Sequence, residues 1–278
     1  MGDGHLGAVS QPCRARADRR PGVSVSQMAS YPSLRGKGVF VSGGGSGIGA
    51  ALVEGFARQG AKVLFVDIAD EPSQALVAKL DGEVDFTPRF VCGDLTDLAF
   101  VKAQVEAAHV LLGGLQILVN NAANDDRHAI AEVTPEYWDE RMAVNLRHLF
   151  FAAQAAVPLM EAAGGGVILN FGSISWHLAL DQLSLYQTAK AGIEGMTRAM
   201  ARELGGKGIR VCAIVPGNVQ TPRQEKWYTP EGEREILDAQ CLKSRVQPDD
   251  VAALTLFLAS DDARMCTGHE YFVDAGWR

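Results

Sequence analysis

A tyrosine and a lysine four residues apart form the first pair in this sequence that could carry out acid–base chemistry. Tyr186 and Lys190 lie early in a segment of helical period over 184–205, and residues at positions i and i+4 share one face of a helix. A tyrosine with an ordinary pKa near 10 needs that pKa lowered by about three units to act as a base at neutral pH, which costs on the order of 4 kcal/mol. A neighbouring cation favours the phenolate, so the spacing predicts a tyrosine base assisted by a lysine ammonium group.

A glycine-rich turn earlier in the sequence predicts a dinucleotide site. The apolar run 38–41 leads directly into Ser-Gly-Gly-Gly-Ser-Gly-Ile-Gly over 42–49, and a helical segment patterned with Ala, Leu and Val follows. Glycines let the turn adopt positive φ and let the backbone approach a pyrophosphate, whose charge is stabilised by free N–H groups at the helix N-terminus. The residues that we expect to bind the cofactor here are Ser42, Gly43, Ser46, Gly47, Ile48 and Gly49.

Two acidic residues at the ends of later apolar runs refine this site. Asp67 lies twenty positions after Gly47, where its carboxylate can accept hydrogen bonds from the adenosine ribose hydroxyls. The same charge repels a 2′-phosphate, so NAD is favoured over NADP; the alternative is that Asp67 caps the following loop. Asp94 either approaches the adenine amino group, with Leu95 beside it, or caps the next helix, and the sequence leaves both roles open.

Short apolar runs that alternate with longer segments of helical period indicate βαβ units and a parallel sheet. We expect seven strands, near 37–42, 62–67, 87–92, 115–119, 166–172, 208–215 and 269–273, with the longest helices near 135–162 and 184–205. This order predicts an α/β fold: a Rossmann-like doubly wound sheet of seven mostly parallel strands, with helices on both faces, in a single domain over 31–278.

Composition excludes several classes of partner. The chain of 278 residues has a net charge of −7 and no basic stripe, so we expect no nucleic-acid binding. With 47% hydrophobic and 21% charged residues it is typical of a globular protein, and because it has no apolar stretch of about 18 residues we expect no membrane span. The five cysteines are scattered, which favours a reduced, cytoplasmic protein without a metal site.

The first thirty residues differ from the rest of the chain. They hold an arginine cluster among Gly, Ser and Pro without an apolar run, and Met28 stands just before the patterned sequence begins. Asp3, Asp18 and the lack of an amphipathic period argue against a transit peptide. We expect residues 1–30 to be a tail without chemistry, either disordered or translated from too early a start codon.

These motifs, in this order, resemble those of the short-chain dehydrogenase/reductase family from about Leu34 to Arg278. Ser42 stands where the family's glycine motif has threonine, and Asn-Asn-Ala-Ala over 120–123 resembles its Asn-Asn-Ala-Gly, with Ala123 in place of glycine. The resemblance implies that this loop and the loop over 216–221 line the cofactor. The residues so implied are Asn121, Ala122, Ala123, Pro216, Gly217, Val219 and Thr221, together with Tyr186 and Lys190.

The same resemblance implies a catalytic tetrad of Asn145, Ser173, Tyr186 and Lys190. Ser173 would hydrogen-bond the reacting oxygen, Tyr186 would take its proton, and hydride would pass to NAD. Lys190 would contact the ribose hydroxyls and lower the tyrosine pKa, and Asn145 would hold a water in the proton relay. The alternatives are that Asn145 is a polar helix residue bonded to backbone, and that Ser175 replaces Ser173.

Three loops at the ends of predicted strands, near 124–128, 175–177 and 224–228, are dense in hydrogen-bonding groups and carry aromatic rings. They suit a polyhydroxylated ligand better than a steroid or an acyl chain, because unpaired buried polar groups are costly; the alternative is that surface loops are polar in any case. Candidate substrate residues are Asn124, Asp126, Ser175, Trp176, His177, Asn218 and Trp227.

Within the family, the segments 124–128, 171–177, 223–233 and 274–278 are similar to those of bacterial sugar-oxidising members. That resemblance implies oxidation of C1 of a cyclic aldopentose to its lactone, with D-xylose expected and L-arabinose or D-glucose open. The alternatives are an NAD(P)H-dependent keto-acid or 3-oxoacyl reductase, and a protein that kept the fold but lost turnover. The family also implies a homotetramer packed through the two longest helices, although these faces could simply cover the sheet.

Overall fold

Seven parallel strands form one sheet in the order β3-β2-β1-β4-β5-β6-β7 in the computed structural model, which describes residues 28–225 and 229–277. The strands are β1 (Gly38–Ser42), β2 (Lys62–Asp67), β3 (Arg89–Cys92), β4 (Ile117–Asn120), β5 (Gly166–Phe171), β6 (Ile209–Pro216) and β7 (Glu270–Val273). The predicted fold class is confirmed, and every strand begins and ends within two residues of its prediction. Most of the expected tail, and Trp227, lie outside the described residues.

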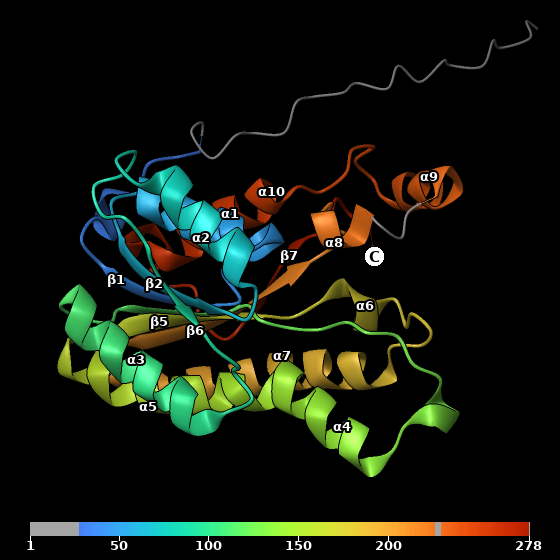
Figure 1. Ribbon diagram of the computed structural model, residues 1–278, viewed down its shortest axis with the longest axis horizontal. Helices are drawn as coiled ribbons and strands as arrows, with labels where there is room; N and C mark the ends of the chain where they lie inside the picture. Colours follow the sequence, from blue (N-terminus) through green and yellow to red (C-terminus); the bar gives the residue numbers. More distant parts are fainter. Residues whose placement is uncertain (1–27, 226–228, 278) are drawn as a thin grey trace, which may run out of the picture.

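Helices cover both faces of the sheet (Figure 1). On one face lie α1 (Gly47–Arg58), α2 (Asp70–Leu80) and α10 (Pro248–Ala259); on the other lie α3 (Leu98–Leu112), α5 (His148–Ala162) and α7 (Ser184–Leu204). The remaining helices are α4 (Pro135–Met142), α6 (Ile174–His177), α8 (Pro222–Glu225), α9 (Pro230–Ala239) and the short turns η2 (Pro32–Leu34), η3 (Ile130–Glu132), η5 (Gly205–Lys207) and η6 (Asp261–Ala263). No helix in the described ranges is long and apolar enough to cross a membrane.

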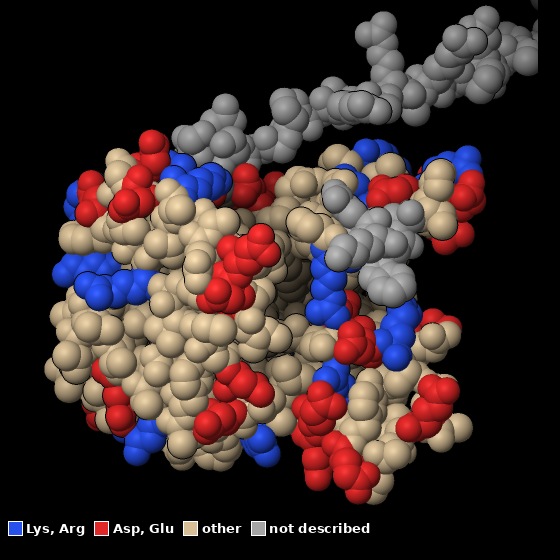
Figure 2. Space-filling view, viewed as in Figure 1, with Lys and Arg blue, Asp and Glu red and all other residues tan. Residues whose placement is uncertain are grey.

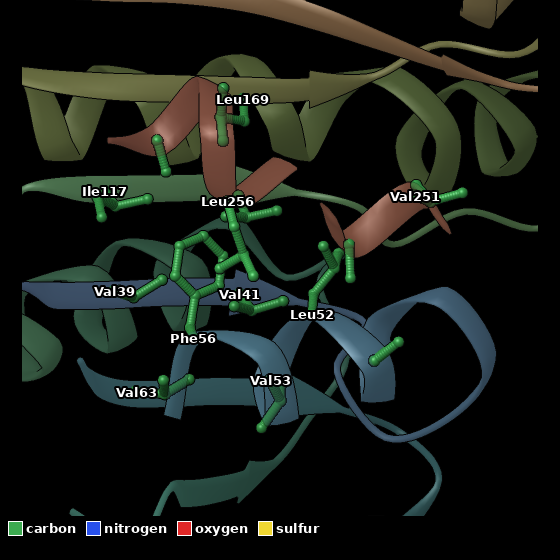
Figure 3. Close-up of a cluster of buried hydrophobic side chains, with 14 of the residues drawn as sticks. Val39, Val41, Leu52, Val53, Phe56, Val63, Ile117, Leu169, Val251 and Leu256 are labelled. Carbon is green, nitrogen blue, oxygen red and sulfur yellow. The ribbon is translucent and has the colours of Figure 1, made fainter. Parts of the chain in front are cut away.

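Alternation along the strands divides the core into two clusters, because successive side chains of a strand point to opposite faces. Val39 and Val41 of β1 pack towards α1 and α10, where they meet Phe56 and Leu256 (Figure 3). Phe40, between them, belongs to the second cluster, on the side of α3 and α5. A strand buried on both faces reads as a continuous apolar run, which is why the strands were recognisable in the sequence.

The predicted helical segment 135–162 is divided by a π-helical turn, η4 (Ala143–Arg147), between α4 and α5. Such turns are rare and recur at functional sites. The turn holds Asn145, whose side chain is fully buried.

The chain reverses its direction of winding between β1 and β4, which are neighbours in the sheet although two strands separate them in the sequence. In open α/β sheets, ligands bind outside the carboxyl ends of the strands at such a switch point. Next to this switch point, a buried pair of side-chain amides joins β4 to β5: Asn120 Nδ2 of β4 donates to Asn170 Oδ1 of β5 over 2.9 Å. The carboxyl ends of β4 and β5 are therefore held together, and the loops that follow them can form a site.

Candidate active site

A cavity of about 660 Å³ lies along the carboxyl ends of the strands. It extends from Asp67 and Asp94 to Ser173, Tyr186 and Lys190. Its volume is in the usual range for ligand sites. Figure 2 shows the molecule hollowed near the centre of the view, between the regions of α2 and α8, with charged side chains along the rim.

Tyr186 and Lys190 lie one turn apart on α7 and both line the cavity. Lys190 Nζ lies 5.4 Å from the centroid of the Tyr186 ring and donates a 2.7 Å hydrogen bond to the Phe171 carbonyl at the end of β5. The spacing of four residues therefore places the ammonium group beside the phenol, and β5 holds the ammonium group in place.

Burial dominates the electrostatics of this pair. It raises the pKa of the Tyr186 phenol; Asp125 raises that pKa further, whereas Ser173 and Arg223 lower it. Burial lowers the pKa of Lys190 to about 8, against the opposing effect of Asp125 and Glu194. At neutral pH and without ligands, the phenol is therefore protonated and the lysine carries its charge.

Ser173 follows β5 and caps the short helix α6, where its Oγ accepts a hydrogen bond from the Ser175 amide over 3.2 Å. Its hydroxyl also bonds to the Ser175 hydroxyl over 3.0 Å, and both serines line the cavity. Of the two serines, Ser173 is the one that lowers the pKa of the Tyr186 phenol. This effect favours Ser173 over Ser175 for contact with the reacting oxygen.

Asn145 does not line the cavity. Its side-chain amide exchanges two hydrogen bonds with the backbone of Asn124: Oδ1 accepts from the amide over 2.8 Å and Nδ2 donates to the carbonyl over 3.0 Å. The side chain therefore behaves as the alternative stated above, a polar helix residue bonded to backbone, and it anchors the loop that follows β4.

The glycine turn after β1 is shaped to bring backbone close to a ligand. Gly43 has φ of +70°, and a Cβ there would lie 2.8 Å from Ala122 Cα. A Cβ on Gly49 would lie 1.8 Å from the Gly43 carbonyl oxygen. Because only glycine fits either position, the turn closes tightly, and the N-terminus of α1 is presented to the cavity, as a pyrophosphate requires.

Asp67 and Asp94 both line the cavity at the adenosine end predicted from the sequence. Asp67 accepts hydrogen bonds from the amides of Gly45 (2.8 Å) and Ala69 (2.9 Å), so it holds the glycine turn and caps its own loop. Asp94 accepts from the Thr96 amide. The alternative role of Asp94 as the cap of the next helix is wrong, because Asp97 caps α3 through the amides of Ala99 and Phe100.

The loop after β4 is fixed from beneath by Ser42, which does not itself line the cavity. Ser42 Oγ accepts hydrogen bonds from the amides of Asn121 (3.0 Å) and Ala122 (3.2 Å). His148, at the start of α5, places Nε2 3.3 Å from the Ala122 carbonyl oxygen. Burial lowers the pKa of this imidazole to about 4, so it is neutral at pH 7. No local pattern in the sequence identifies His148, because its contact joins segments 26 residues apart.

The remaining cofactor candidates lie where the sequence placed them. The cavity is lined by Ser46, Gly47, Ile48, Leu95, Asn121, Ala122, Ala123, Pro216, Gly217, Val219 and Thr221, in addition to the residues named above. The glycine cradle, a carboxylate at one end and a tyrosine–lysine pair at the other fit a nicotinamide dinucleotide.

The substrate candidates divide into two groups. Asn124, Ser175 and Asn218 line the cavity. Trp176 and His177 do not: Trp176 Nε1 donates to Glu194 Oε1 over 2.8 Å, and His177 Nε2 lies 3.3 Å from the same oxygen. The buried Glu194 carboxylate on α7 therefore draws both rings away from the cavity.

Asp126 also lies outside the cavity lining. Its carboxylate oxygens lie 3.1 Å from Arg141 and 3.1 Å from Arg223, and the side chain is 54% exposed. It belongs to an ionic cluster on the rim.

The structure adds cavity residues that the sequence had not singled out. Asp125, Arg223 and Gln224 line it on the polar side, while Leu178, Leu180, Leu183 and Trp277 also contribute. Asp125 and Gln224 lie within the loops 124–128 and 224–228 that were predicted to meet the substrate, and Trp277 stands within a segment whose family resemblance was recognised.

Comparison with known proteins agrees with the geometry. The family model described as Enoyl-(Acyl carrier protein) reductase matches residues 43–278. The D-xylose 1-dehydrogenase of Caulobacter vibrioides is 62% identical over 250 residues, which are 90% of this chain and 99% of that protein. The probable galactose dehydrogenase GalD of Rhizobium meliloti is 49% identical over 249 residues, 89% of this chain and 97% of that protein.

A solved short-chain dehydrogenase from Burkholderia cenocepacia in complex with NADP superposes with a TM-score of 0.81 at 30% identity, covering 88% of this chain and 98% of that one. The 7α-hydroxysteroid dehydrogenase complexed with NADH superposes with a TM-score of 0.83 at 30% identity, covering 88% of this chain and 96% of that one. Both neighbours hold a nicotinamide cofactor, one with and one without the 2′-phosphate.

Proposed function

Because this chain belongs to the short-chain dehydrogenase/reductase family, we propose that it is an NAD-dependent dehydrogenase that oxidises C1 of a cyclic aldose, D-xylose, to the lactone. The observation that carries the proposal is the meeting of Ser173, Tyr186 and Lys190 at one end of a cavity whose other end carries Asp67. Similarity to the Caulobacter D-xylose 1-dehydrogenase supports the choice of sugar.

The residues divide the work as follows. Ser173 donates a hydrogen bond to the C1 oxygen, and Tyr186 takes the proton from that oxygen as the C1 hydrogen leaves. When bound, the oxidised nicotinamide supplies the hydride acceptor and a positive charge beside the phenol. Lys190 adds a second positive charge 5.4 Å from the ring, which favours the phenolate that burial opposes. Asn145 orders the Asn124 loop and is a positioning residue for this step.

The preference for NAD rests on Asp67. Its carboxylate ends β2 inside the cavity, where it would accept hydrogen bonds from both ribose hydroxyls and repel a 2′-phosphate. A sugar substrate is supported by the polar groups that line the same cavity as Tyr186, among them Asn124, Ser175 and Asn218.

Two further properties belong to this proposal. The exposed aromatic side chains of Trp138 on α4 and Phe150 on α5 support a homotetramer packed through α4–α5 and α7, which sedimentation at micromolar concentration would test against a monomer. The four described cysteines, Cys92, Cys212, Cys241 and Cys266, are free, which supports a cytoplasmic location.

The first experiment measures initial rates of NADH formation from D-xylose, L-arabinose, D-glucose and a simple secondary alcohol, each with NAD. A clear preference for D-xylose is expected. Reaction of another aldose alone would keep the chemistry and change the substrate. If no aldose reacts while a keto acid or a 3-oxoacyl compound is reduced with NADH or NADPH, the reductase alternative replaces this proposal.

The role of Tyr186 is tested by Tyr186→Phe, which keeps the ring and removes the hydroxyl. Turnover is expected to fall at least about 100-fold, the usual contribution of a general base, while NADH affinity is retained. Tyr137→Phe is the matched control, because Tyr137 lies on α4 and does not line the cavity. Unchanged turnover in Tyr186→Phe would refute the mechanism.

A further inference from the structure

Asp125 joins two loops that meet over the catalytic end of the cavity. It belongs to the loop after β4, and its Oδ1 lies 2.9 Å from Arg223 Nη2 of α8. Gln224 Nε2, also on α8, donates to Asp125 Oδ2 over 3.2 Å. Among the described residues each carboxylate oxygen thus has one partner, and because an ionised carboxylate offers about four lone-pair sites, both oxygens retain acceptor capacity.

The position of this carboxylate distinguishes it from its neighbour. Asp125 lines the cavity with its side chain 33% exposed, and it is the carboxylate that acts on Tyr186 and also acts on Lys190. Asp126, the next residue, pairs with the same Arg223 at 3.1 Å but does not line the cavity. Asp126 is therefore sufficient to connect the loop after β4 to Arg223. Asp125, in contrast, faces the cavity that Tyr186 and Lys190 also line.

A negative charge here opposes the proposed chemistry. It disfavours ionisation of the phenol that must become the base, whereas the Arg223 charge favours that ionisation. A cavity built only for proton transfer would not place a carboxylate there. The carboxylate is well suited to another task, because hydroxyl groups donate strong, short hydrogen bonds to an ionised carboxylate.

We infer that Asp125 recognises the substrate: its carboxylate accepts hydrogen bonds from ring hydroxyls of the aldose other than the C1 hydroxyl, and Arg223 and Gln224 are positioning residues that orient it. This inference rests on the proposed function, since it supposes that C1 of an aldose lies at Ser173 and Tyr186. It makes Asp125 a specificity-determining residue, in addition to the substrate candidates predicted from the sequence.

The test compares Asp125→Asn with the matched control Asp126→Asn. Both variants remove one negative charge beside Arg223, but only the first changes a carboxylate in the cavity. Steady-state kinetics at saturating NAD use D-xylose and its 2-deoxy, 3-deoxy and 4-deoxy analogues. NADH affinity, followed by fluorescence, and the melting temperature establish that each variant is folded and binds cofactor.

Asp125→Asn is expected to raise KM for D-xylose about tenfold or more, the effect of losing one charge-assisted hydrogen bond. Asp126→Asn is expected to change KM less than about twofold, and both variants should keep NADH affinity. The wild type should prefer D-xylose over at least one deoxy analogue. Asp125→Asn should lose that preference, because it lacks the carboxylate that accepts a hydrogen bond from the hydroxyl missing in the analogue.

A second readout would not respond to a purely structural role. The charged and polar groups that shift the pKa of the Tyr186 phenol are Asp125, Ser173 and Arg223, and Lys190 Nζ lies 5.4 Å from the centroid of its ring. Removing the Asp125 charge makes the phenol easier to ionise, so the pH at which kcat reaches half its maximum should fall in Asp125→Asn and stay unchanged in Asp126→Asn.

Three results would overturn the inference: equal KM changes in the two variants, weakened NADH binding in Asp125→Asn, or an unchanged preference across the deoxy series. If instead the wild type oxidises no aldose, the proposed function fails before the variants are compared. If the wild type oxidises D-xylose and Asp125→Asn has the same KM and the same preference across the deoxy analogues, this inference is refuted and the proposed function is retained.

Discussion

Replacing His148 with glutamine tests whether one buried neutral imidazole sets the acid limit of this fold. His148 is fully buried under the loop after β4, with Nε2 3.3 Å from the Ala122 carbonyl oxygen. Burial lowers its pKa from 6.5 to about 4; the Lys190 charge acts in the same direction, while the bond to Ala122 and the Asp94 charge act against it. The unfolded chain therefore binds a proton here at a higher pH than the folded chain.

The sign and size of the effect follow from that difference. Because the folded pKa is depressed, the stabilisation is complete above pH 6.5 and is lost as the pH falls through about 4. The gap corresponds to about 3 kcal/mol, since one pKa unit is about 1.4 kcal/mol. For a chain of this size, about 3 kcal/mol corresponds to roughly 6 to 12 °C in melting temperature.

The assay is thermal unfolding between pH 7.5 and pH 4 of the wild type, His148→Gln and His269→Gln. Glutamine can keep an N–H donor for the Ala122 carbonyl but does not titrate, so the melting temperature of His148→Gln should fall less with acid than that of the wild type, by roughly 6 °C or more at pH 4. His269 is exposed, and its variant should follow the wild type. Parallel curves for all three proteins would refute the reasoning.

Three further substitutions have expected outcomes. Asp67→Asn keeps an acceptor for the turn but removes the charge that repels a 2′-phosphate, so the ratio of kcat/KM for NAD to that for NADP should fall about tenfold or more; an unchanged ratio would contradict the assignment of NAD. Gly49→Ala should lower the melting temperature by about 5 °C or more, because its Cβ would lie 1.8 Å from the Gly43 carbonyl oxygen, whereas Gly205→Ala, in open space with φ of −58°, should not. Burial lowers the pKa of Lys190 from 10.5 to about 8, so the wild type loses about 3 kcal/mol of stability as the pH falls from 10.5 through 8. Lys190→Met should abolish turnover. The melting temperature of this variant minus that of the wild type should be larger at pH 7 than at pH 10.5, because only the wild type buries a charge at pH 7. An equal difference at both pH values would show that the buried charge does not destabilise the fold.

The central strands β1, β2, β4, β5 and β6 were predictable because burial on both faces makes them nearly continuous apolar runs, whereas the edge strands β3 and β7 are only partly buried. The helical segment 135–162 was predictable in extent but not in form, since hydrophobic period does not reveal the π-helical turn at Ala143–Arg147. That turn decides how Asn145 is used. Its amide bonds to the Asn124 backbone, a contact across 21 residues of sequence that no local pattern encodes.

The two ends of the site differ in how far the sequence could specify them. The cofactor end is built from backbone geometry at the glycine turn and from strand-end residues such as Asp67, so motif spacing predicts residues that the fold brings to one cavity. The substrate end depends on which polar side chains bond to each other and which remain directed into the cavity. Trp176 and His177 looked suited to a sugar, but Glu194, from a different helix, holds both of them. Asp125 and Asp126 are equivalent in sequence, and only the fold directs one of them into the cavity.

Charge at the catalytic end explains why the resting site holds an acid. Burial and Asp125 keep the Tyr186 phenol protonated, and Arg223 opposes Asp125 without overcoming burial. A protonated phenol donates to a carbonyl oxygen, whereas oxidation needs it to accept a proton, and that change requires additional positive charge near the ring. Lys190 supplies one charge permanently at neutral pH, because even its lowered pKa of about 8 leaves the ammonium form dominant. In the proposed mechanism the further charge arrives with the oxidised cofactor, so the base would form only in the complex in which hydride has an acceptor. Cofactor binding would then be coupled to proton removal, and the buried Lys190 charge would assist at a cost in folding stability that Lys190→Met would reveal.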